Sequence, residues 1–243
     1  MTTQSTSNAI HTLNVNQALL KAGQLQAQGS LRDAEMLIQQ VLKAEPENAH
    51  ALHLLGVIAH QVGKLDLAIQ LIERALASND KVALFHANIG EMYRQIGQLD
   101  FAIEHGERAI SLDKKMASAH SNLGIAHYDK KEYDIAENYQ KRAIALNPKL
   151  GTALNNLGSI CKERKQPDES IRWYRAAIAT SDTYAEPLNN LGAVLVTEQR
   201  FSEAFEILKK ALNKKQNFSD AHCNMGFALN GLDKYEAALP HFQ

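Results

Sequence analysis

A glycine recurs every 34 residues along most of this chain, and this period constrains the fold more than any other feature. The six positions are Gly56, Gly90, Gly124, Gly158, Gly192 and Gly226, and Ala22 stands one period earlier. Each glycine lies in an apolar stretch of helical periodicity, where glycine costs about 1 kcal/mol relative to alanine. We expect one common reason for this cost, a close approach of two helices that leaves no room for a β-carbon. A fixed period of this length is typical of a solenoid of helical hairpins.

The period divides the chain into seven repeats, the last of them incomplete. Their ranges are 15–48, 49–82, 83–116, 117–150, 151–184, 185–218 and 219–243, and a polar segment, 1–14, that we expect to be flexible precedes them. We number the places of each repeat from 1 to 34, so that the recurrent glycine occupies place 8. Place 20 is alanine or serine throughout, and turn signals such as Gly63 and Pro148 fall between the apolar stretches. Each repeat is therefore predicted to consist of helix A, a short turn, helix B and a second turn.

This pattern resembles the tetratricopeptide repeat family over residues 15–243. The residues that carry the resemblance are leucine and glycine at places 7 and 8, alanine at places 20 and 27, and proline at place 32. In the fourth repeat they are Leu123, Gly124, Ala136, Ala143 and Pro148. The resemblance implies an all-α, right-handed superhelical solenoid of about seven 34-residue helix–turn–helix repeats. It also implies that helix A lines a concave groove, and that the array binds peptides or proteins and is not itself an enzyme.

The chain departs from the family pattern at two places. Place 4, often aromatic or leucine in the family, is histidine at His86, His120 and His222, which we expect to pack between helices. Place 24, usually large and apolar, is Gly106 and Gln140 in the third and fourth repeats. These two residues suggest softer packing around helix B of those repeats.

Place 6 carries the main functional hypothesis. It is asparagine in five successive repeats, at Asn88, Asn122, Asn156, Asn190 and Asn224. The resemblance places it in the groove with places 2, 5, 9, 12 and 13, and its amide offers both a donor and an acceptor to the backbone of an extended chain. The sequence Asn-Leu-Gly at places 6 to 8 resembles that of the superhelix of the O-linked N-acetylglucosamine transferases, where a ladder of asparagines holds a polypeptide. The alternative is that duplicated repeats kept an ancestral asparagine on a tolerant surface.

We therefore predict a protein-interaction scaffold that binds an extended polypeptide in its groove. The residues expected to set selectivity beside the asparagines are His53, Arg94, Tyr128, Asn155, Asn189 and Phe227. The absence of lysine and arginine from places 2, 5, 6 and 9 argues against a clamp for a terminal carboxylate.

Two further functional alternatives remain open from the sequence. The chain could be the N-terminal, substrate-recruiting region of a larger enzyme such as a protein O-glycosyltransferase, which the residues following Gln243 in the native protein would decide. It could also self-associate through its C-terminal end, where we expect Phe227, Leu239 and Phe242 to be poorly covered.

Composition argues against several other classes of protein. Lysine plus arginine number 26 and aspartate plus glutamate 27, without the basic stripe that nucleic acid would require. No apolar run reaches the ~20 residues of a membrane-spanning helix, and the N-terminus lacks the features of a signal peptide, so we expect a cytoplasmic protein. His53 and His60 are two helical turns apart, too far to share a metal ion easily, so we interpret them and His50 as polar residues of the groove. Cys161 is expected to be a buried hydrophobic residue, and Cys223 has no positioned base. We expect no cofactor and no metal.

Overall fold

The computed structural model describes residues 14–181 and 184–242, and helices are the only regular structure in these ranges. The all-α prediction is therefore confirmed for this part of the chain. The segment expected to be flexible, 1–14, lies outside the described residues except for Asn14, whose side chain caps the first described helix. The chain forms two compact units, residues 1–114 and 115–243, which are taken in turn.

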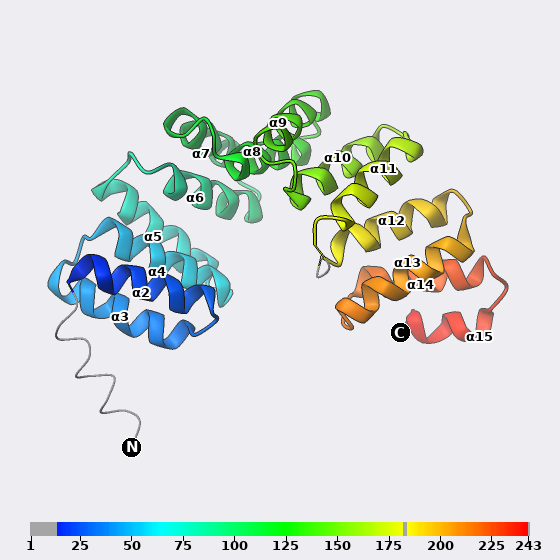
Figure 1. The fold of residues 1–243 in the computed structure, drawn as a ribbon, viewed down its shortest axis with the longest axis horizontal. Helices are drawn as coiled ribbons and strands as arrows, with labels where there is room; N and C mark the ends of the chain where they lie inside the picture. Colours follow the sequence, from blue (N-terminus) through cyan, green and yellow to red (C-terminus); the bar gives the residue numbers. More distant parts are fainter. Residues whose placement is uncertain (1–13, 182–183, 243) are drawn as a thin grey trace, which may run out of the picture. The chain divides into compact units, whose positions relative to one another are not determined.

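Unit 1 consists of three antiparallel helical pairs, one for each of the first three repeats (Figure 1). The pairs are α2 (Val15–Ala27) with α3 (Leu31–Ala44), α4 (Ala49–Gln61) with α5 (Leu65–Ser78), and α6 (Ala83–Gln95) with α7 (Leu99–Leu112). Leu52, Ile72, Phe85 and Ile89 are almost completely buried between the second and third pairs. The apolar positions of successive helices thus form one core through the unit, as the helical periodicity predicts.

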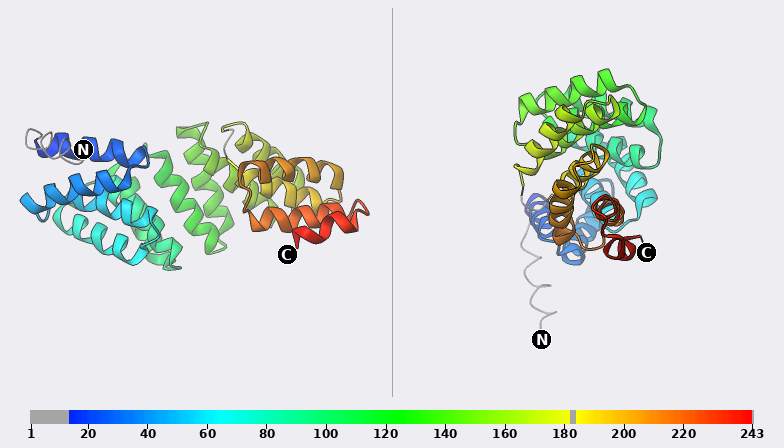
Figure 2. Two further views of the ribbon diagram at one scale, coloured as in Figure 1. Left: turned by 90° about the horizontal axis from the view of Figure 1, so that it is seen from below. Right: turned by 90° about the vertical axis from the view of Figure 1, so that its right-hand side faces the viewer.

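Unit 2 continues the same pairing through the remaining repeats (Figure 2). The elements are α8 (Ala117–Asp129), α9 (Tyr133–Leu146), α10 (Gly151–Glu163), α11 (Pro167–Ile178), α12 (Glu186–Thr197), α13 (Phe201–Lys214), α14 (Ser219–Asn230), α15 (Tyr235–Ala238) and the 3₁₀ turn η1 (Leu239–His241). Tyr174, Leu191, Leu195 and Leu208 lie in its largest apolar cluster. Phe227, Leu239 and Phe242 near its end are 49%, 64% and 48% exposed, so the prediction that they are poorly covered is confirmed.

The recurrent glycines lie where helix A crosses helix B of the same repeat. A β-carbon added to Gly158 would lie 2.5 Å from the Tyr174 ring, and one added to Gly192 would lie 2.5 Å from the Leu208 side chain. The residue that fills this space is the one at place 24: Ile72, Gln140, Tyr174, Leu208 and Phe242. The predicted close approach is confirmed: five of the six glycines face the place 24 side chain, whereas a β-carbon on Gly90 would lie 3.1 Å from the Ala102 carbonyl oxygen.

Gln140 does not loosen the fourth repeat. Its side chain is completely buried, its Oε1 accepts a hydrogen bond from Ser121 Oγ at 3.0 Å, and its Nε2 donates to the Ser121 carbonyl at 2.9 Å. The expectation of softer packing is therefore wrong at this residue, because both ends of the amide are paired in the space that Gly124 leaves open. Gly106 is also buried and leaves the space beside Gly90 lined by backbone.

The turn between helices A and B has the same left-handed backbone in every repeat. Place 15 has φ between 57° and 79° at Gly29, Gly63, Gly97, Lys131, Lys165, Gln199 and Asp233. Glycine adopts this conformation without steric cost, whereas other L-residues lose about 1–2 kcal/mol. Repeats 4 to 7 therefore carry turn strain that repeats 1 to 3 avoid.

We predict that Gly158→Ala destabilises the protein by ~1–3 kcal/mol, because the added methyl group overpacks the Tyr174 ring. The control is Gly23→Ala on α2, where a β-carbon would meet no atom within 4 Å. That control should be stabilising by up to ~1 kcal/mol, through helix propensity alone. Urea unfolding of both variants measures the difference, and equal effects would contradict the close-approach interpretation.

We also predict that Lys131→Gly and Lys165→Gly each stabilise the protein by ~0.5–1 kcal/mol. Glycine removes the strain of the left-handed backbone, and part of this gain is offset because glycine raises the conformational entropy of the unfolded chain. Lys130→Gly is the matched control, because Lys130 has φ −76° and gains nothing from glycine. Thermal melting distinguishes the variants. Stabilisation by the control, or destabilisation by both place 15 variants, would refute the role of the turn.

Candidate functional site

At places 5 and 6, hydrogen bonds join α4 to α6 in unit 1, and α10 to α12 and α12 to α14 in unit 2. The place 6 amide contacts the place 5 side chain of the preceding repeat, 35 residues earlier in the chain. Asn88 Nδ2 lies 2.9 Å from His53 Nε2, Asn190 Nδ2 lies 3.0 Å from Asn155 Oδ1, and Asn224 Nδ2 lies 2.9 Å from Asn189 Oδ1. Neighbouring A helices are thus offset by one residue relative to the 34-residue period.

In repeats 5 to 7 these bonds form a continuous chain of amides. Asn224 donates to Asn189, Asn189 Nδ2 donates to Asn190 Oδ1 at 3.4 Å, and Asn190 donates to Asn155. Each amide in the middle of the chain uses its donor and its acceptor. Hydrogen bonds in such a chain polarise one another, and removing a middle member leaves two buried polar groups without a partner.

The place 5 side chains are not open to the groove. His53, Asn155 and Asn189 are 5%, 9% and 7% exposed. The sequence-based expectation that these three side chains lie open beside the asparagines is therefore wrong, because the next repeat packs over place 5. The place 6 amides of Asn88, Asn190 and Asn224 are themselves partly buried in these bonds.

Asn122 and Asn156 lack this bond between repeats. The residue 35 positions before Asn122 is Ala87, which has no polar side chain. The residue 35 positions before Asn156 is Ser121, whose hydroxyl donates instead to Gln140. Asn156 Nδ2 is buried and has no hydrogen-bond partner among the described residues. These two amides are therefore the place 6 positions whose orientation no place 5 partner fixes.

A second row of contacts links places 12 and 13 of successive repeats. His60 Nε2 lies 2.9 Å from Gln95 Oε1, and the Tyr128 hydroxyl donates to Glu163 at 3.5 Å. Burial, together with the charge of Glu163, raises the pKa of Tyr128. Arg94, the remaining predicted site residue at place 12, forms an ion pair with Glu91 at 2.7 Å. The helix A surface is thus crossed by two rows of polar bonds, which sequence analysis did not predict as bonds.

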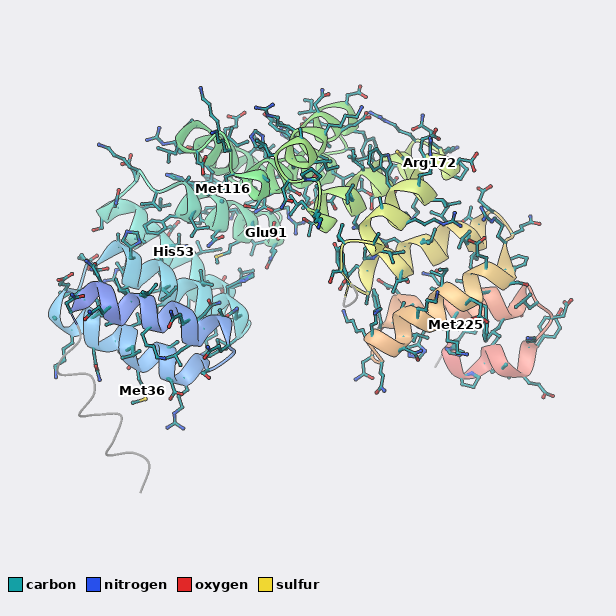
Figure 3. All side chains as sticks on the ribbon, in the orientation of Figure 1. Met36, His53, Glu91, Met116, Arg172 and Met225 are labelled. Carbon is teal, nitrogen blue, oxygen red and sulfur yellow. The ribbon has the colours of Figure 1, made fainter. Side chains whose placement is uncertain are left out.

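His53 (labelled in Figure 3) is an uncharged residue of this contact between repeats. Its ring stacks on Phe85 with centroids 4.4 Å apart. Because Asn88 Nδ2 can only donate, His53 Nε2 accepts and carries no proton. Burial, and then the nearby His50, lower the pKa of His53 from 6.5 to about 4. Protonation of His53 and the bond to Asn88 therefore exclude each other.

The remaining residues considered for chemistry lie apart from one another. No cluster of three or more metal-ligating side chains occurs in the described part of the chain. Burial raises the pKa of the Cys161 thiol, which keeps it protonated, and Cys223 is an exposed free cysteine. His120 is buried, as expected for place 4. None of the described helices is long and apolar enough to cross a membrane.

We predict that acid weakens the bond between repeats 2 and 3. The unfolded chain binds a proton at His53 below pH 6.5, whereas the folded chain does so only near pH 4, so stability falls as the pH drops between these values. From pH 7 to pH 5 the loss from His53 should be about 1–2 kcal/mol. His53→Asn keeps an acceptor for Asn88, as Asn155 and Asn189 do for their partners, and should remove this part of the pH dependence. Urea unfolding at both pH values tests it, and an unchanged dependence in the variant would contradict the prediction.

Comparison with known proteins places the chain in a family. A family model described as tetratricopeptide repeat matches residues 115–183 and 149–217, a second of the same description matches 19–83, and one described as TPR repeat matches 90–131. A search of curated protein sequences finds no match.

Solved structures agree with the family models. The Cut9–Hcn1 hetero-tetramer of the APC/C is 18% identical with a TM-score of 0.80, over 93% of this chain and 47% of that one. A tetratricopeptide repeat protein from Parabacteroides merdae is 19% identical with a TM-score of 0.72, over 94% and 90% of the two chains. YrrB, described as a TPR protein with an unusual peptide-binding site, is 20% identical with a TM-score of 0.52, over 70% and 88%. At these identities the likeness shows the fold alone. The family models and the stacked helical pairs together show that this chain belongs to the tetratricopeptide repeat family.

Proposed function

We propose that this protein is an interaction scaffold whose unit 2 holds an extended polypeptide along its A helices, with Asn122 and Asn156 as the residues that bind the backbone of that polypeptide. The tetratricopeptide repeat is a protein-interaction fold, and the similar protein YrrB is described as having a peptide-binding site. The observation that carries the proposal is the unfixed state of these two amides.

An asparagine side chain can bind a peptide backbone only if its amide can rotate to point its donor and its acceptor toward the ligand. Rotation of the Asn156 amide breaks no hydrogen bond, because its Nδ2 has none among the described residues. The same rotation at Asn190 breaks bonds to both Asn155 and Asn189. Asn190 and Asn224 therefore act mainly in holding repeats together, and the five-residue ladder divides into structural and binding members.

The spacing of the two amides suits an extended ligand. Packed helices lie 8–10 Å apart, and an extended chain advances about 3.3 Å per residue. Asn122 and Asn156, one repeat apart, would therefore contact peptide groups about three residues apart. The exposed place 2 side chains beside them, Ser118 and Thr152, are uncharged, which favours recognition of the peptide backbone over recognition of a charged side chain.

The test compares two sets of variants against a peptide selected on the wild-type protein from a random library. Asn122→Ala combined with Asn156→Ala should weaken peptide binding by ~1–3 kcal/mol, because each bond contributes a net ~0.5–1.5 kcal/mol. The melting temperature should stay near that of the wild type, since alanine is the better helix former. Fluorescence anisotropy measures the binding.

Asn190→Ala is the matched control, with the opposite expectation. It should lower stability by ~1–3 kcal/mol, because it leaves Asn155 and Asn189 buried without their partner. Peptide affinity should stay nearly unchanged at a temperature where the variant is folded. The proposal is refuted if the double variant binds the selected peptide as tightly as the wild type.

A further inference from the structure

Repeat 5 lacks the large side chain that the other repeats carry at place 17, the first residue of helix B. Place 17 is leucine in unit 1, and it is Tyr133, Phe201 and Tyr235 in the other repeats of unit 2, whereas repeat 5 has Pro167. The side chain of proline closes on its own backbone nitrogen, so it does not reach across to a neighbouring helix. Helix B of repeat 5 thus begins without the aromatic ring that the other repeats of unit 2 place there.

The next repeat along the chain shows what a large side chain does at place 17. A β-carbon added to Gly231 would lie 2.5 Å from the Phe201 ring, so this ring packs against place 13 of the following repeat. The corresponding residues one repeat earlier are Pro167 and Thr197. Leu65, at place 17 in unit 1, also packs against an apolar cluster. Place 17 is thus a position at which a leucine or an aromatic side chain is held between one repeat and the next.

A hollow of about 450 Å³ lies where Pro167 replaces that side chain, beside α10, α11 and α12 (Figure 1). The residues that line it are Lys162, Lys165, Pro167, Val194, Thr197 and Glu198. Val194 is a buried apolar residue, and the Thr197 hydroxyl already donates to the Ala193 carbonyl at 3.0 Å. The volume is within the range of about 300–1,000 Å³ that is usual for ligand sites. The hollow can therefore accept a large side chain from another molecule and offers it an apolar contact.

We propose that this hollow binds an aromatic side chain, phenylalanine or tyrosine, of the polypeptide held by unit 2, an inference that rests on the function proposed above. The bound ring takes the place of the place 17 side chain, which is aromatic in every other repeat of unit 2. A ring also suits the charge of the hollow, because the ammonium groups of lysines such as Lys162 and Lys165 are attracted to ring faces. This contact already occurs in unit 2, where Lys215 Nζ lies 4.5 Å from the centroid of the Phe218 ring.

The hollow lies within reach of a polypeptide that is bound at Asn156. Lys162 follows Asn156 by six residues on α10, which corresponds to about 9 Å along the helix. An extended chain covers this distance in about three residues. The aromatic residue is therefore expected about three residues from the peptide group that Asn156 binds, and the two contacts together fix the register of the polypeptide on unit 2.

The first experiment fills the hollow from within the protein. Pro167→Phe restores an aromatic side chain at place 17, and Pro167→Ala is the matched control that leaves the hollow open. Peptides selected from a random library on the wild type should share a phenylalanine or tyrosine, and replacing that residue by alanine should weaken binding ~10–100-fold, as expected for a buried aromatic side chain. Pro167→Ala should bind these peptides as the wild type does. Pro167→Phe should bind them ~10–100-fold more weakly, while melting at or above the wild-type temperature because the added ring fills a hollow.

A second measurement tests the hollow without any peptide, so its outcome does not depend on Asn122 and Asn156. The probe is p-cresol, which has the structure of the tyrosine side chain. It should shift the methyl signals of Val194 and Thr197 in nuclear magnetic resonance, saturably, in the wild type and in Pro167→Ala. It should not shift them in Pro167→Phe, and the methyl signal of Thr152, at the other end of α10, should not move in any of the three proteins.

Three results would overturn the proposal. They are unchanged Val194 and Thr197 signals with p-cresol in the wild type, selected peptides that share an acidic or an aliphatic residue instead of an aromatic one, and equal binding of the selected peptide by Pro167→Phe and Pro167→Ala. Failure of the function proposed above is distinct from these results. In that case Asn122→Ala combined with Asn156→Ala leaves peptide binding intact, while p-cresol still shifts the two methyl signals of the hollow.

Discussion

The contact between the place 8 glycine and the place 24 side chain determines how helix A lies on helix B in repeats 2 and 4 to 7. The missing β-carbon brings the helices together, and place 24 fills the space that remains: a branched side chain at Ile72, an amide at Gln140 and an aromatic ring at Tyr174. This space accepts different shapes because only the volume next to the glycine is fixed. The hairpin geometry is thereby constant, and other places can vary without changing it.

The sequence predicted this part of the fold because its cause is steric and local. A glycine at a fixed helical position reports a close contact whatever the neighbouring residue is, so the period alone located the hairpins. The prediction failed at Gln140 because an amide in a core is unfavourable only if it is unpaired. Its partner, Ser121, comes from helix A of the same repeat, a contact that residue type does not reveal.

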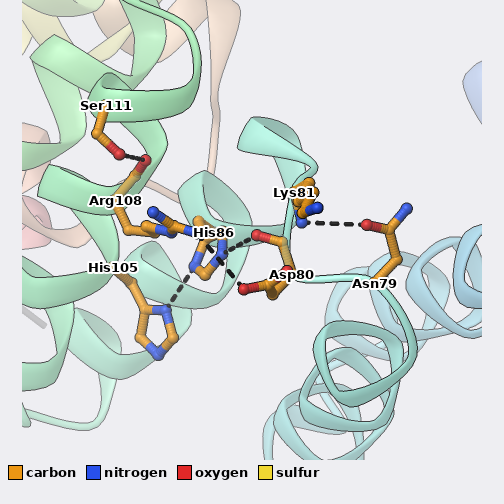
Figure 4. A network of polar contacts seen from close by, with 7 residues as sticks. All are labelled: Asn79, Asp80, Lys81, His86, His105, Arg108 and Ser111. Carbon is orange, nitrogen blue, oxygen red and sulfur yellow. Dashed lines mark hydrogen bonds and ion pairs between the residues drawn. The ribbon is translucent and has the colours of Figure 1, made fainter.

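The candidate site was predicted less completely, because it depends on how successive repeats pack. The sequence itself contains the row of asparagines at place 6, but the one-residue offset between A helices decides what each amide contacts. That offset makes Asn190 a partner of Asn155 and leaves Asn156 without a partner of this kind. The contact between His86 Nδ1 and His105 Nδ1, 2.9 Å apart (Figure 4), was not predicted for the same reason, since their spacing of 19 residues becomes a contact only when α6 and α7 are packed.

Buried polar bonds between repeats serve a purpose that apolar packing alone does not. An apolar surface between two parallel helices tolerates a slip of one residue, whereas a chain of amides from Asn224 to Asn155 is satisfied only at one offset. The bonds therefore specify the register of repeats 5 to 7 more than they add to stability. The chain of amides stops between Ser121 and Asn156, because Ser121 donates to Gln140 within its own repeat, and the register of repeats 4 and 5 rests on other contacts such as the Tyr128–Glu163 hydrogen bond. Under the proposed function, this gap leaves the Asn122 and Asn156 amides able to rotate toward a ligand, whereas an amide committed to the register is not available for recognition.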